Sequence, residues 1–394
     1  MKKIFSNFKG DRVIWIVVVM LLLFSLLSVY SSSGVLAFKN KAGNTEYYLI
    51  KQAMFLLFGF ALMYVTHLIK YTYYSRISQI ILVVSIPLLI LTLFMGSIND
   101  ASRWLYVPGT SITFQSSDLA KLALIMYVAR MLTLKQGNIT DFKEAFLPVL
   151  MPILVVCGLI LPANFSTAAI LFATCLVLMF IGRIKLRFIL SLIGIGVLCF
   201  SVYILIAINS NSKGRIGTWK HRIERFTKNV PEGSEEGNYQ VEQAKIAIAT
   251  GGILGKKPGR STQRYYLPHP YSDFIFAFII EEYGLVGGTG IVFLYLILLY
   301  RGVRIATKTQ STFGMLLAIG CCLSLIFQTL INMAVAVNLL PVTGQPLPLV
   351  SMGGTSILFT SISVGIILSI SREVEEEKQN KVEIEQIEAN AGVE

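Results

Sequence analysis

Residues 267–277, LPHPYSDFIFA, turn a long polar segment back into an apolar run. A proline-rich corner comes first, a lone carboxylate, Asp273, follows it, and the next residues are as apolar as the core of a bilayer. A carboxylate costs several kcal/mol to desolvate unless another group pairs with it. We therefore expect a membrane span to begin after Asp273 and this ionisable group at its edge to have a function.

The composition of the whole chain indicates an integral membrane protein. Of its 394 residues, 54% are hydrophobic and 14% are charged, whereas about 25% of the residues of a soluble domain are charged. The mean hydropathy is +0.67. The net charge of +12 could indicate nucleic-acid binding, but the basic residues are scattered between apolar runs. We attribute them to the orientation of membrane spans and expect no nucleic-acid partner.

Apolar runs of the length that a bilayer requires, roughly 20 residues, recur along the chain. The first run is longer than the core of a signal peptide, about 7–15 residues, so we expect a retained span. We predict an all-α polytopic membrane protein with about ten transmembrane helices. The expected spans cover residues 13–33, 49–69, 77–96, 118–134, 146–162, 165–182, 188–208, 274–300, 313–337 and 346–370.

Positive charges predict the orientation of these spans, because short cytoplasmic loops carry an excess of Lys and Arg. Ten spans with a cytoplasmic N-terminus place both termini inside and residues 209–272 in one large extracytoplasmic loop. We predict a single transmembrane domain, 1–371, and a charged, mobile cytoplasmic tail, 372–394. The short inner loops then hold Lys70, Arg76, Lys135, Lys143, Arg183, Lys185, Arg187, Arg301, Arg304 and Lys308, and the short outer loops hold Lys39, Lys41 and Arg103.

Two further segments show helical patterns. Residues 241–253, VEQAKIAIATGGI, place small and apolar residues at helical spacing, which predicts a short helix at the membrane surface or on the bundle. Gly284 and Gly288 form a GxxxG motif inside an apolar span, which predicts close packing between helices.

Three polar groupings at the expected outer ends of spans are candidates for chemistry. The first is FQSSDLAK, residues 114–121, where Asp118 and Lys121 are three residues apart and can share one face of a helix. Their charges allow two interpretations. They form an internal ion pair that neutralises itself, or they line a charged cavity that binds an anionic substrate.

The second grouping contains Asp273, with Glu281 and Glu282 roughly two turns further along the expected span. Two adjacent carboxylates in an apolar helix must face the bundle interior, pair with basic residues or be neutral. They form either a structural polar network or part of the site. The aqueous edge at Asp273 suits a general base.

The third grouping is NLLPVTGQPLPLVSMGGTS, residues 338–356, whose prolines and glycines break a helix near the outer surface. Irregular backbone at membrane depth is tolerated where it lines a cavity or is buried in protein. We therefore expect a re-entrant segment that forms part of a site.

In this order, the motifs resemble those of the SEDS family, the shape, elongation, division and sporulation proteins typified by FtsW and RodA. The motifs that carry the resemblance are Arg103-Trp104, FQSSDLAK, LPHPYSDFIFAFIIEEYGLVG from residue 267 and NLLPVTGQPLPLVSMGGTS from residue 338. The resemblance implies an inverting peptidoglycan glycosyltransferase that polymerises lipid II on the outer face of the cytoplasmic membrane and releases undecaprenyl diphosphate. It also implies a class B penicillin-binding protein and other membrane proteins of cell division as partners.

The resemblance also implies roles for single residues, with Asp273 as the catalytic carboxylate. The cavity residues that it implies are Arg103, Trp104, Gln115, Ser117, Asp118 and Lys121. We expect Glu281, Ser351, Gly353 and Gly354 to complete the substrate site. The diphosphate requires a cationic environment. For this role we expect Lys121 and Arg103, helped by Arg215, Lys220 or Arg222. A divalent cation, Mg²⁺ or Mn²⁺, could share this work, although no ligand cluster in the sequence requires one.

The chain departs from the usual family motifs in places. The family's FQPSE is FQSSD here, with Ser116 in place of Pro and Asp118 in place of Glu. The family's PDLGT is ANFST, so Asn164 carries no charge. Met352 and Thr355 replace Tyr and Ser. The motif around the catalytic carboxylate is intact, so we expect the chain to be active.

Other functions fit parts of this pattern. Intramembrane charges and a broken helix also describe a lipid II flippase, but a transporter needs charge along a path through the bilayer, and the polar motifs here gather on the outer side. A scaffold that only recruits a synthase would not need Asp273. The charged tail and the N-terminal segment KGDRVIW favour the FtsW branch of cell division, with the elongation polymerase of the RodA branch as the alternative.

Overall fold

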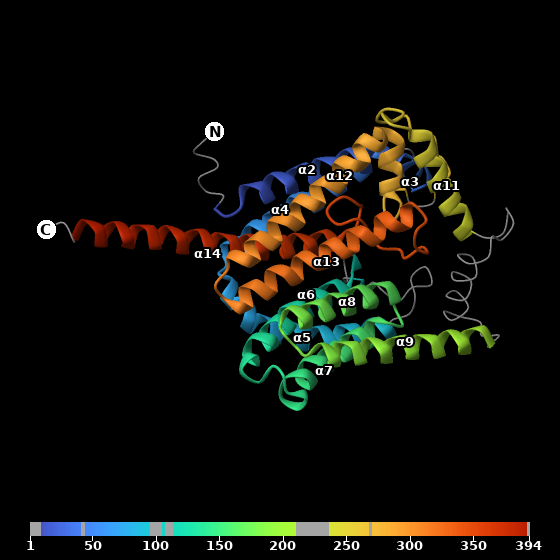
Figure 1. Cartoon of the computed structure of the whole chain (residues 1–394). Helices are drawn as coiled ribbons and strands as arrows, with labels where there is room; N and C mark the ends of the chain where they lie inside the picture. Colours follow the sequence, from blue (N-terminus) through green and yellow to red (C-terminus); the bar gives the residue numbers. More distant parts are fainter. Residues whose placement is uncertain are drawn as a thin grey trace.

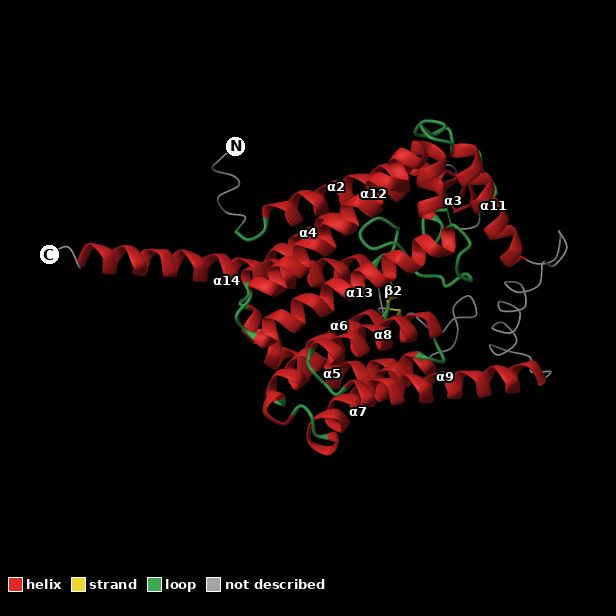
Figure 2. Ribbon diagram, in the orientation of Figure 1, coloured by secondary structure: helices red, strands yellow, loops and turns green. Residues whose placement is uncertain are grey.

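The computed structural model of this chain describes residues 9–40, 44–94, 105–106, 113–209, 236–267 and 270–391. Most of the described residues lie in helices, so the all-α prediction is confirmed (Figures 1 and 2). The long helices are α2 (Arg12–Ser32), α4 (Thr45–Leu68), α5 (Tyr71–Phe94), α6 (Ser116–Leu134), α7 (Leu147–Ile160), α8 (Phe165–Ile181), α9 (Leu186–Asn209), α11 (Glu236–Gly251), α12 (Ile275–Lys308), α13 (Thr312–Ala336) and α14 (Thr355–Ala391). The shorter elements are α3 (Gly34–Asn40), η1 (Gln136–Asn138), η2 (Phe142–Phe146), η3 (Gln263–Tyr265) and the antiparallel strands β1 (Leu105–Tyr106) and β2 (Thr113–Phe114).

The lengths and compositions of the helices confirm a multi-pass membrane protein. Within the described ranges, seven helices are long and apolar enough to cross a membrane, and α8 and the first part of α9 are shorter apolar helices. Each expected span overlaps a helix, including α6, and the exact number of spans stays a prediction. The span expected at 346–370 starts later, at Thr355, because the Pro- and Gly-rich residues before it are irregular.

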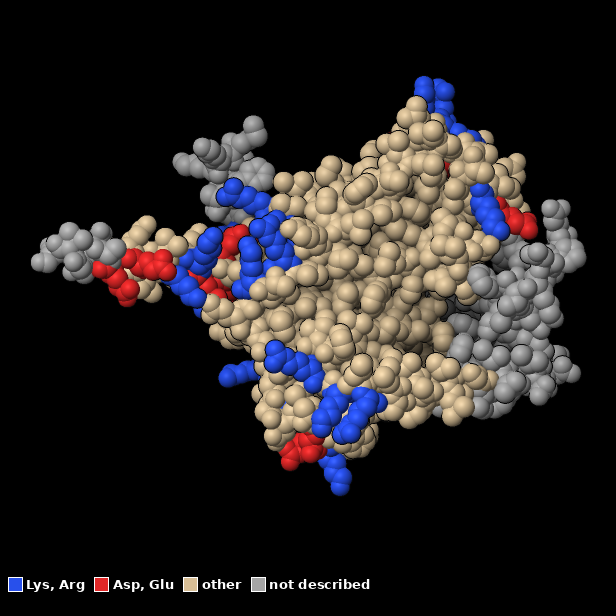
Figure 3. All heavy atoms as spheres, viewed as in Figure 1, with Lys and Arg blue, Asp and Glu red and all other residues tan. Residues whose placement is uncertain are grey.

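The surface of the bundle has the apolar band, between two charged ends, that a membrane-spanning protein presents to a bilayer. Figure 3 shows Lys and Arg side chains gathered at the end from which α14 projects and near α11, with an almost uncharged surface between them. Large apolar side chains face outward in this band, for example Leu57, Ile80 and Phe293, which are 70%, 68% and 64% exposed. An apolar surface of this extent is unfavourable in water and is covered by lipid in a membrane.

The two ends of the chain meet at the same end of the bundle. Lys9 pairs with Glu376 at 3.2 Å, and the main-chain N–H of Gly10 donates to Glu375 at 3.1 Å. Arg301 Nε donates to Asp11 Oδ2 at 2.6 Å. An even number of spans requires this arrangement, which agrees with the prediction that both termini lie on one side of the membrane.

The tail continues α14 as one helix to Ala391 and projects from the bundle (Figure 1). We expected a mobile tail because residues 372–394 lack an apolar face. Glu, Lys and Gln have high helix propensity, so a helix can extend here without a packing partner. The mobility of this extension stays a prediction.

The helix after Asp273 is broken at Gly284, a feature that the expected span over 274–300 did not include. Gly284 has φ 70° and ψ −172°, a conformation that favours glycine. The first half of α12, residues 275–283, therefore lies at an angle to the second half, residues 285–308, which crosses the bundle (Figure 1). The GxxxG motif thus marks a turn at its first glycine as well as close packing at its second, Gly288.

A backbone crossing explains the break. The chain after α11 passes so closely that a Cβ atom on Gly284 would overlap the backbone of Ile253 and Gly255. Main-chain hydrogen bonds of 2.9 to 3.2 Å join the two segments, from Lys256 to Glu281 and from the residues after Gly284 back to residues 252–253. The predicted helix at 241–253 is confirmed as α11. It is docked on α12 by these contacts.

Candidate active site

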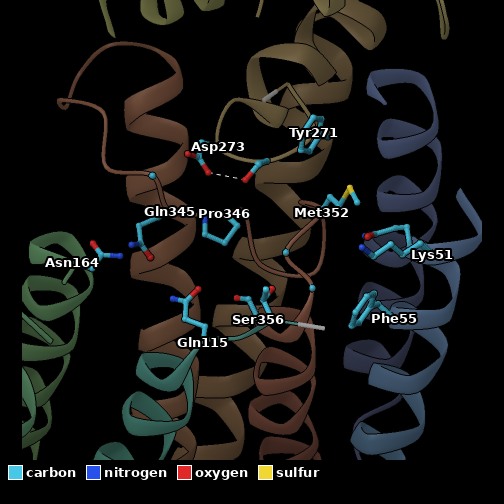
Figure 4. A pocket seen from close by; sticks show the side chains of 16 residues that line it. Lys51, Phe55, Gln115, Asn164, Tyr271, Asp273, Gln345, Pro346, Met352 and Ser356 are labelled. Atoms are coloured by element: carbon cyan, nitrogen blue, oxygen red, sulfur yellow. Dashed lines mark hydrogen bonds between the residues drawn. The ribbon is translucent and has the colours of Figure 1, made fainter. Parts of the chain in front are cut away.

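A cavity of about 380 Å³ lies at the end of the bundle where α4, α6, α8, α12 and α14 begin. Polar side chains converge on it from segments that are far apart in the sequence (Figure 4). It is lined by Lys51, Gln52, Phe55, Thr113, Gln115, Asn164, Tyr271, Ser272, Asp273, Gly344, Gln345, Pro346, Met352, Gly353, Gly354 and Ser356. Of the site residues predicted from the sequence, Gln115, Asp273, Gly353 and Gly354 are brought together here.

Asp273 lies at the edge of this cavity, just before the first half of α12. Its Oδ1 accepts a hydrogen bond from Ser272 Oγ at 2.8 Å, and its main-chain oxygen accepts one from Asn332 Nδ2 at 2.9 Å. Phe274 and Phe278, 1% and 0% exposed, hold the next turn in the core. The carboxylate is half-buried on a firmly held backbone, and it has no ion-pair partner in the described part of the chain.

The Pro- and Gly-rich segment forms one wall of the cavity. Ser351 Oγ accepts from the main-chain N–H of Leu347 at 2.8 Å and donates to the main-chain oxygen of Ser272 at 2.7 Å. The N–H of Met352 donates to the oxygen of Tyr271 at 2.9 Å. Ser351 therefore supports the wall from behind and does not line the cavity. Burial raises the pKa of Tyr271 to about 12, so this phenol stays protonated at neutral pH.

Asn332 connects this wall to Asp273. It is 1% exposed, and its Nδ2 donates both to the main-chain oxygen of Asp273 and, at 2.7 Å, to that of Gln345. The side chain of Gln345 in turn donates to Thr167 Oγ1 at 2.8 Å. Asn164 begins the same helix, α8, as its N-cap and accepts from the N–H of Thr167 at 3.3 Å. The wall, the carboxylate segment and α8 are thus held in one hydrogen-bonded network.

Asp118 and Lys121 form an internal ion pair behind the cavity. Their side chains are 2.9 Å apart and only 3% and 12% exposed. Lys121 also donates to Gln328 at 3.1 Å, and Gln328 donates to the main-chain oxygen of Pro346 in the cavity wall at 2.9 Å. Neither charged residue lines the cavity. The geometry agrees with the self-neutralising pair and does not support direct contact of Lys121 with substrate.

Gln115 connects this ion pair to the cavity. Its Nε2 donates to Ser117 Oγ at 3.0 Å and lies 3.5 Å from Asp118 Oδ1. Its main-chain N–H donates to Thr355 Oγ1 at 3.3 Å, at the start of α14. Gln115 therefore lines the cavity, whereas Ser117 and Asp118 orient it from behind.

Glu281 and Glu282 anchor the segment that follows α11 and do not line the cavity, although we had expected Glu281 to bind substrate. Both are 0% exposed. Glu281 accepts from Lys256 Nζ at 2.8 Å and from the N–H of Thr262 at 3.1 Å. Glu282 accepts from the N–H of Gly259 at 2.8 Å. The geometry agrees with a structural polar network that binds residues 256–263 to the broken helix.

Comparison with known proteins shows the family to which this chain belongs. The model of a family described as "Cell cycle protein", FtsW/RodA/SpoVE, matches residues 11–376. The chain belongs to the FtsW/RodA/SpoVE family. It is 35% identical over 377 residues to the "Probable peptidoglycan glycosyltransferase FtsW" of Trichlorobacter lovleyi, covering 94% of this chain and 95% of that relative. It is 33% identical to the "Stage V sporulation protein E" of Bacillus subtilis, covering 92% and 97%.

Solved structures share the fold of this FtsW/RodA/SpoVE member. One is described as "Structural coordination of polymerization and crosslinking by a peptidoglycan synthase complex", with a TM-score of 0.73, 24% identity, and coverage of 93% of this chain and 98% of that chain. Another is the rod shape determining protein RodA of Thermus thermophilus, with a TM-score of 0.65, 23% identity, and coverage of 92% and 97%. At this level of identity the likeness concerns the fold alone.

Sequence reasoning missed the contribution of α4. Lys51, Gln52 and Phe55 line the cavity, yet no family motif had drawn attention to them. The signal was present, because a lysine seven residues into an apolar helix is costly unless it has a function. Asn164, noted only as a departure from the family motif, also lines the cavity.

Some predicted residues lie outside the described residues. They are Arg103, Trp104, Arg215, Lys220 and Arg222. Among the described residues, no group of three or more His, Cys, Asp or Glu side chains could hold a metal ion. Asp273 is the carboxylate of the described cavity lining. These residues alone do not form a dedicated cation site, and a role for Mg²⁺ or Mn²⁺ stays a prediction.

Proposed function

We propose that this protein is a peptidoglycan glycosyltransferase that polymerises lipid II. Family membership supports this function, as do relatives that carry the name peptidoglycan glycosyltransferase FtsW. The observation that carries the proposal is the position of Asp273, the carboxylate of the family motif, at a cavity lined by amide and hydroxyl groups. Such a lining can bind sugar hydroxyls and leaves the carboxylate free for proton transfer.

In the proposed reaction, the 4-hydroxyl oxygen of the acceptor sugar attacks C1 of the donor sugar. The hydroxyl proton goes to the carboxylate of Asp273. The bond between C1 and the diphosphate oxygen breaks, and undecaprenyl diphosphate leaves with the electron pair of that bond. A β-1,4 linkage replaces the α linkage, so the configuration at C1 inverts. General-base catalysis contributes typically about 10²–10⁴-fold.

The residues around Asp273 orient the reactants in this proposal. Ser272 and Asn332 hold the carboxylate segment in place. Gln115 offers the cavity a polar side chain that can bind sugar hydroxyls, and Gln345 helps to hold the wall. Preorganised groups of this kind lower the barrier because they need no rearrangement during the reaction. The glycines of the wall leave room for substrate. The lining is supported from behind by Ser351, Ser117, Asp118 and Lys121. Arg103 and Trp104 remain proposed cavity residues.

The proposal also covers location and partners. We place the protein in the cytoplasmic membrane with the cavity and the loop around α11 on the outer face, where a lipid-linked sugar presents its head group. The positive charges of the inner loops support this orientation. The partner that we propose is a class B penicillin-binding protein, together with other membrane proteins of cell division. Relatives named FtsW support the division branch over the elongation branch.

Reconstitution of the purified full-length protein with lipid II tests this function. We expect glycan strands from the wild type, alone or with its penicillin-binding partner, and none from Asp273→Asn. Glu242→Gln is the matched control, because Glu242 is an exposed carboxylate on α11, outside the cavity. It should polymerise at the wild-type rate.

The same assay separates the alternatives. Movement of lipid II between leaflets without polymer would identify a flippase. Normal glycan synthesis by Asp273→Asn would refute the role of this carboxylate. Wild-type protein that makes no polymer under any condition, yet is needed for synthesis by the partner, would identify a scaffold.

A further inference from the structure

Of the two main cations that we expected for the diphosphate of the substrate, Arg103 lies outside the described residues and Lys121 is not free. Lys121 is bound to Asp118 and Gln328 and does not line the cavity. Among the described lining residues, Lys51 is the basic side chain. We propose that Lys51 of α4 binds the diphosphate of a lipid-linked substrate. This inference rests on the proposed function and assigns a subsite within it.

The position of Lys51 in α4 is firmly held. It is the seventh residue of α4, about 9 Å along the helix from its start at 1.5 Å per residue. The next residue, Gln52, is 1% exposed and donates from Nε2 to Ser25 Oγ of α2 at 2.8 Å. This buried bond fixes the rotation of α4. Lys51 then reaches into the cavity, opposite Asn164 of α8 (Figure 4).

Lys51 differs from the other partly buried cations of the bundle. Lys121, Lys256 and Arg301 each pair with a buried carboxylate. The structure gives Lys51 no such carboxylate within the described ranges. A half-buried ammonium group at membrane depth is costly without an anion. An anionic ligand in the cavity would provide the missing partner.

The helices that begin at the cavity favour an anion as well. Gln115 is the N-cap of α6 and makes no side-chain capping bond, so the first N–H groups of that helix lack this partner. Asn164 is the N-cap of α8, and Gly353, Gly354 and Ser356 surround the start of α14. A helix N-terminus carries about half a positive charge and binds phosphate through its free N–H groups. These partial charges act on the same space as Lys51.

The order of groups along the cavity matches a lipid-linked sugar. Figure 4 shows Asp273 among the loops, with Lys51, Gln115 and Ser356 below it in this view. Lys51 lies within α4, whereas Gln115 and Ser356 lie at the starts of α6 and α14. In such a substrate the diphosphate lies between the lipid tail and the sugar. With the diphosphate at Lys51, the sugar attached to it extends toward Asp273, which takes the proton of the acceptor hydroxyl in the proposed reaction.

Binding measurements on the full-length protein in lipid nanodiscs test this subsite. The probes are undecaprenyl diphosphate and undecaprenol, with EDTA present to remove bridging divalent cations. Lys51→Met should weaken binding of undecaprenyl diphosphate by about 10- to 100-fold, the effect of one charge-assisted hydrogen bond, and leave binding of undecaprenol unchanged. Lys51→Arg should retain most of the affinity. The control, Lys245→Met, removes an exposed lysine of α11 and should bind like the wild type.

A second measurement protects the test against misfolding. Unchanged binding of undecaprenol by Lys51→Met shows that this variant is folded, so a loss of affinity for undecaprenyl diphosphate alone reports the subsite. Equal affinity of wild type and Lys51→Met for undecaprenyl diphosphate would overturn the subsite.

The outcomes separate this inference from the proposed function. Lys51-dependent binding in a protein that makes no glycan would refute the polymerase and keep the subsite. Glycan synthesis with unchanged kcat, KM and lipid affinity in Lys51→Met would keep the polymerase and refute the subsite.

Discussion

Substitution of Gly284 by alanine tests the break in α12. At φ 70° and ψ −172° a side chain is strained, at a cost of about 2 kcal/mol. The added Cβ would also overlap the backbone of Ile253 and Gly255. Moving that segment away breaks main-chain hydrogen bonds of 2.9 to 3.2 Å, each worth about 1 kcal/mol.

The expected loss of stability follows from these terms. Strain plus one lost hydrogen bond gives about 3 kcal/mol, and strain plus all four bonds between the segments gives about 6 kcal/mol. The residues before Gly284 carry Asp273, so we also expect lower glycan synthesis in the fraction that remains folded. Gly290→Ala is the matched control, because a Cβ at Gly290 meets nothing within 4 Å. It should be neutral or stabilise the helix by up to about 1 kcal/mol.

Two measurements check this prediction. Thermal unfolding in detergent, followed by the loss of the monodisperse peak in gel filtration, reports stability. The rate of trypsin cleavage after Lys256 or Arg260 reports release of the docked segment. We expect a lower midpoint and faster cleavage for Gly284→Ala than for Gly290→Ala. Equal midpoints and equal cleavage rates in the two variants would refute the steric origin of the break.

Two further substitutions test the groups behind the cavity. Lys121→Met leaves Asp118 buried without its partner and should destabilise the protein by about 3–5 kcal/mol in thermal unfolding. The double variant with Asp118→Asn should recover most of that loss, and an additive double variant would contradict the ion pair. Asn332→Ala releases the segment of Asp273 and should lower kcat for lipid II polymerisation about 10- to 100-fold with a smaller change in KM. An effect on KM alone would contradict a positioning role, and partial rescue by Asn332→Gln would support it.

Much of the site could be predicted from local sequence. Gln115, Asp273, Gly353 and Gly354 belong to motifs at the ends of apolar runs, and they line one cavity. The prediction was less specific for charged residues inside helices. Two interpretations of Lys121 were open because a sequence states which charges exist and not which of them are paired.

The sequence by itself determined the class of this protein and the place of its carboxylate. In a bilayer every backbone polar group needs an internal partner, so long apolar runs must become helices, and Asp273 has to lie where one of them meets the polar loop. The tertiary structure decided what each charge does. Lys121 is neutralised beside Gln328, which is 207 residues away, and Lys51 is left facing the cavity. It also decided the break at Gly284, because the cause is a backbone crossing by a segment that precedes it by about thirty residues. Pairing and steric exclusion depend on neighbours in space, which only the packed bundle defines.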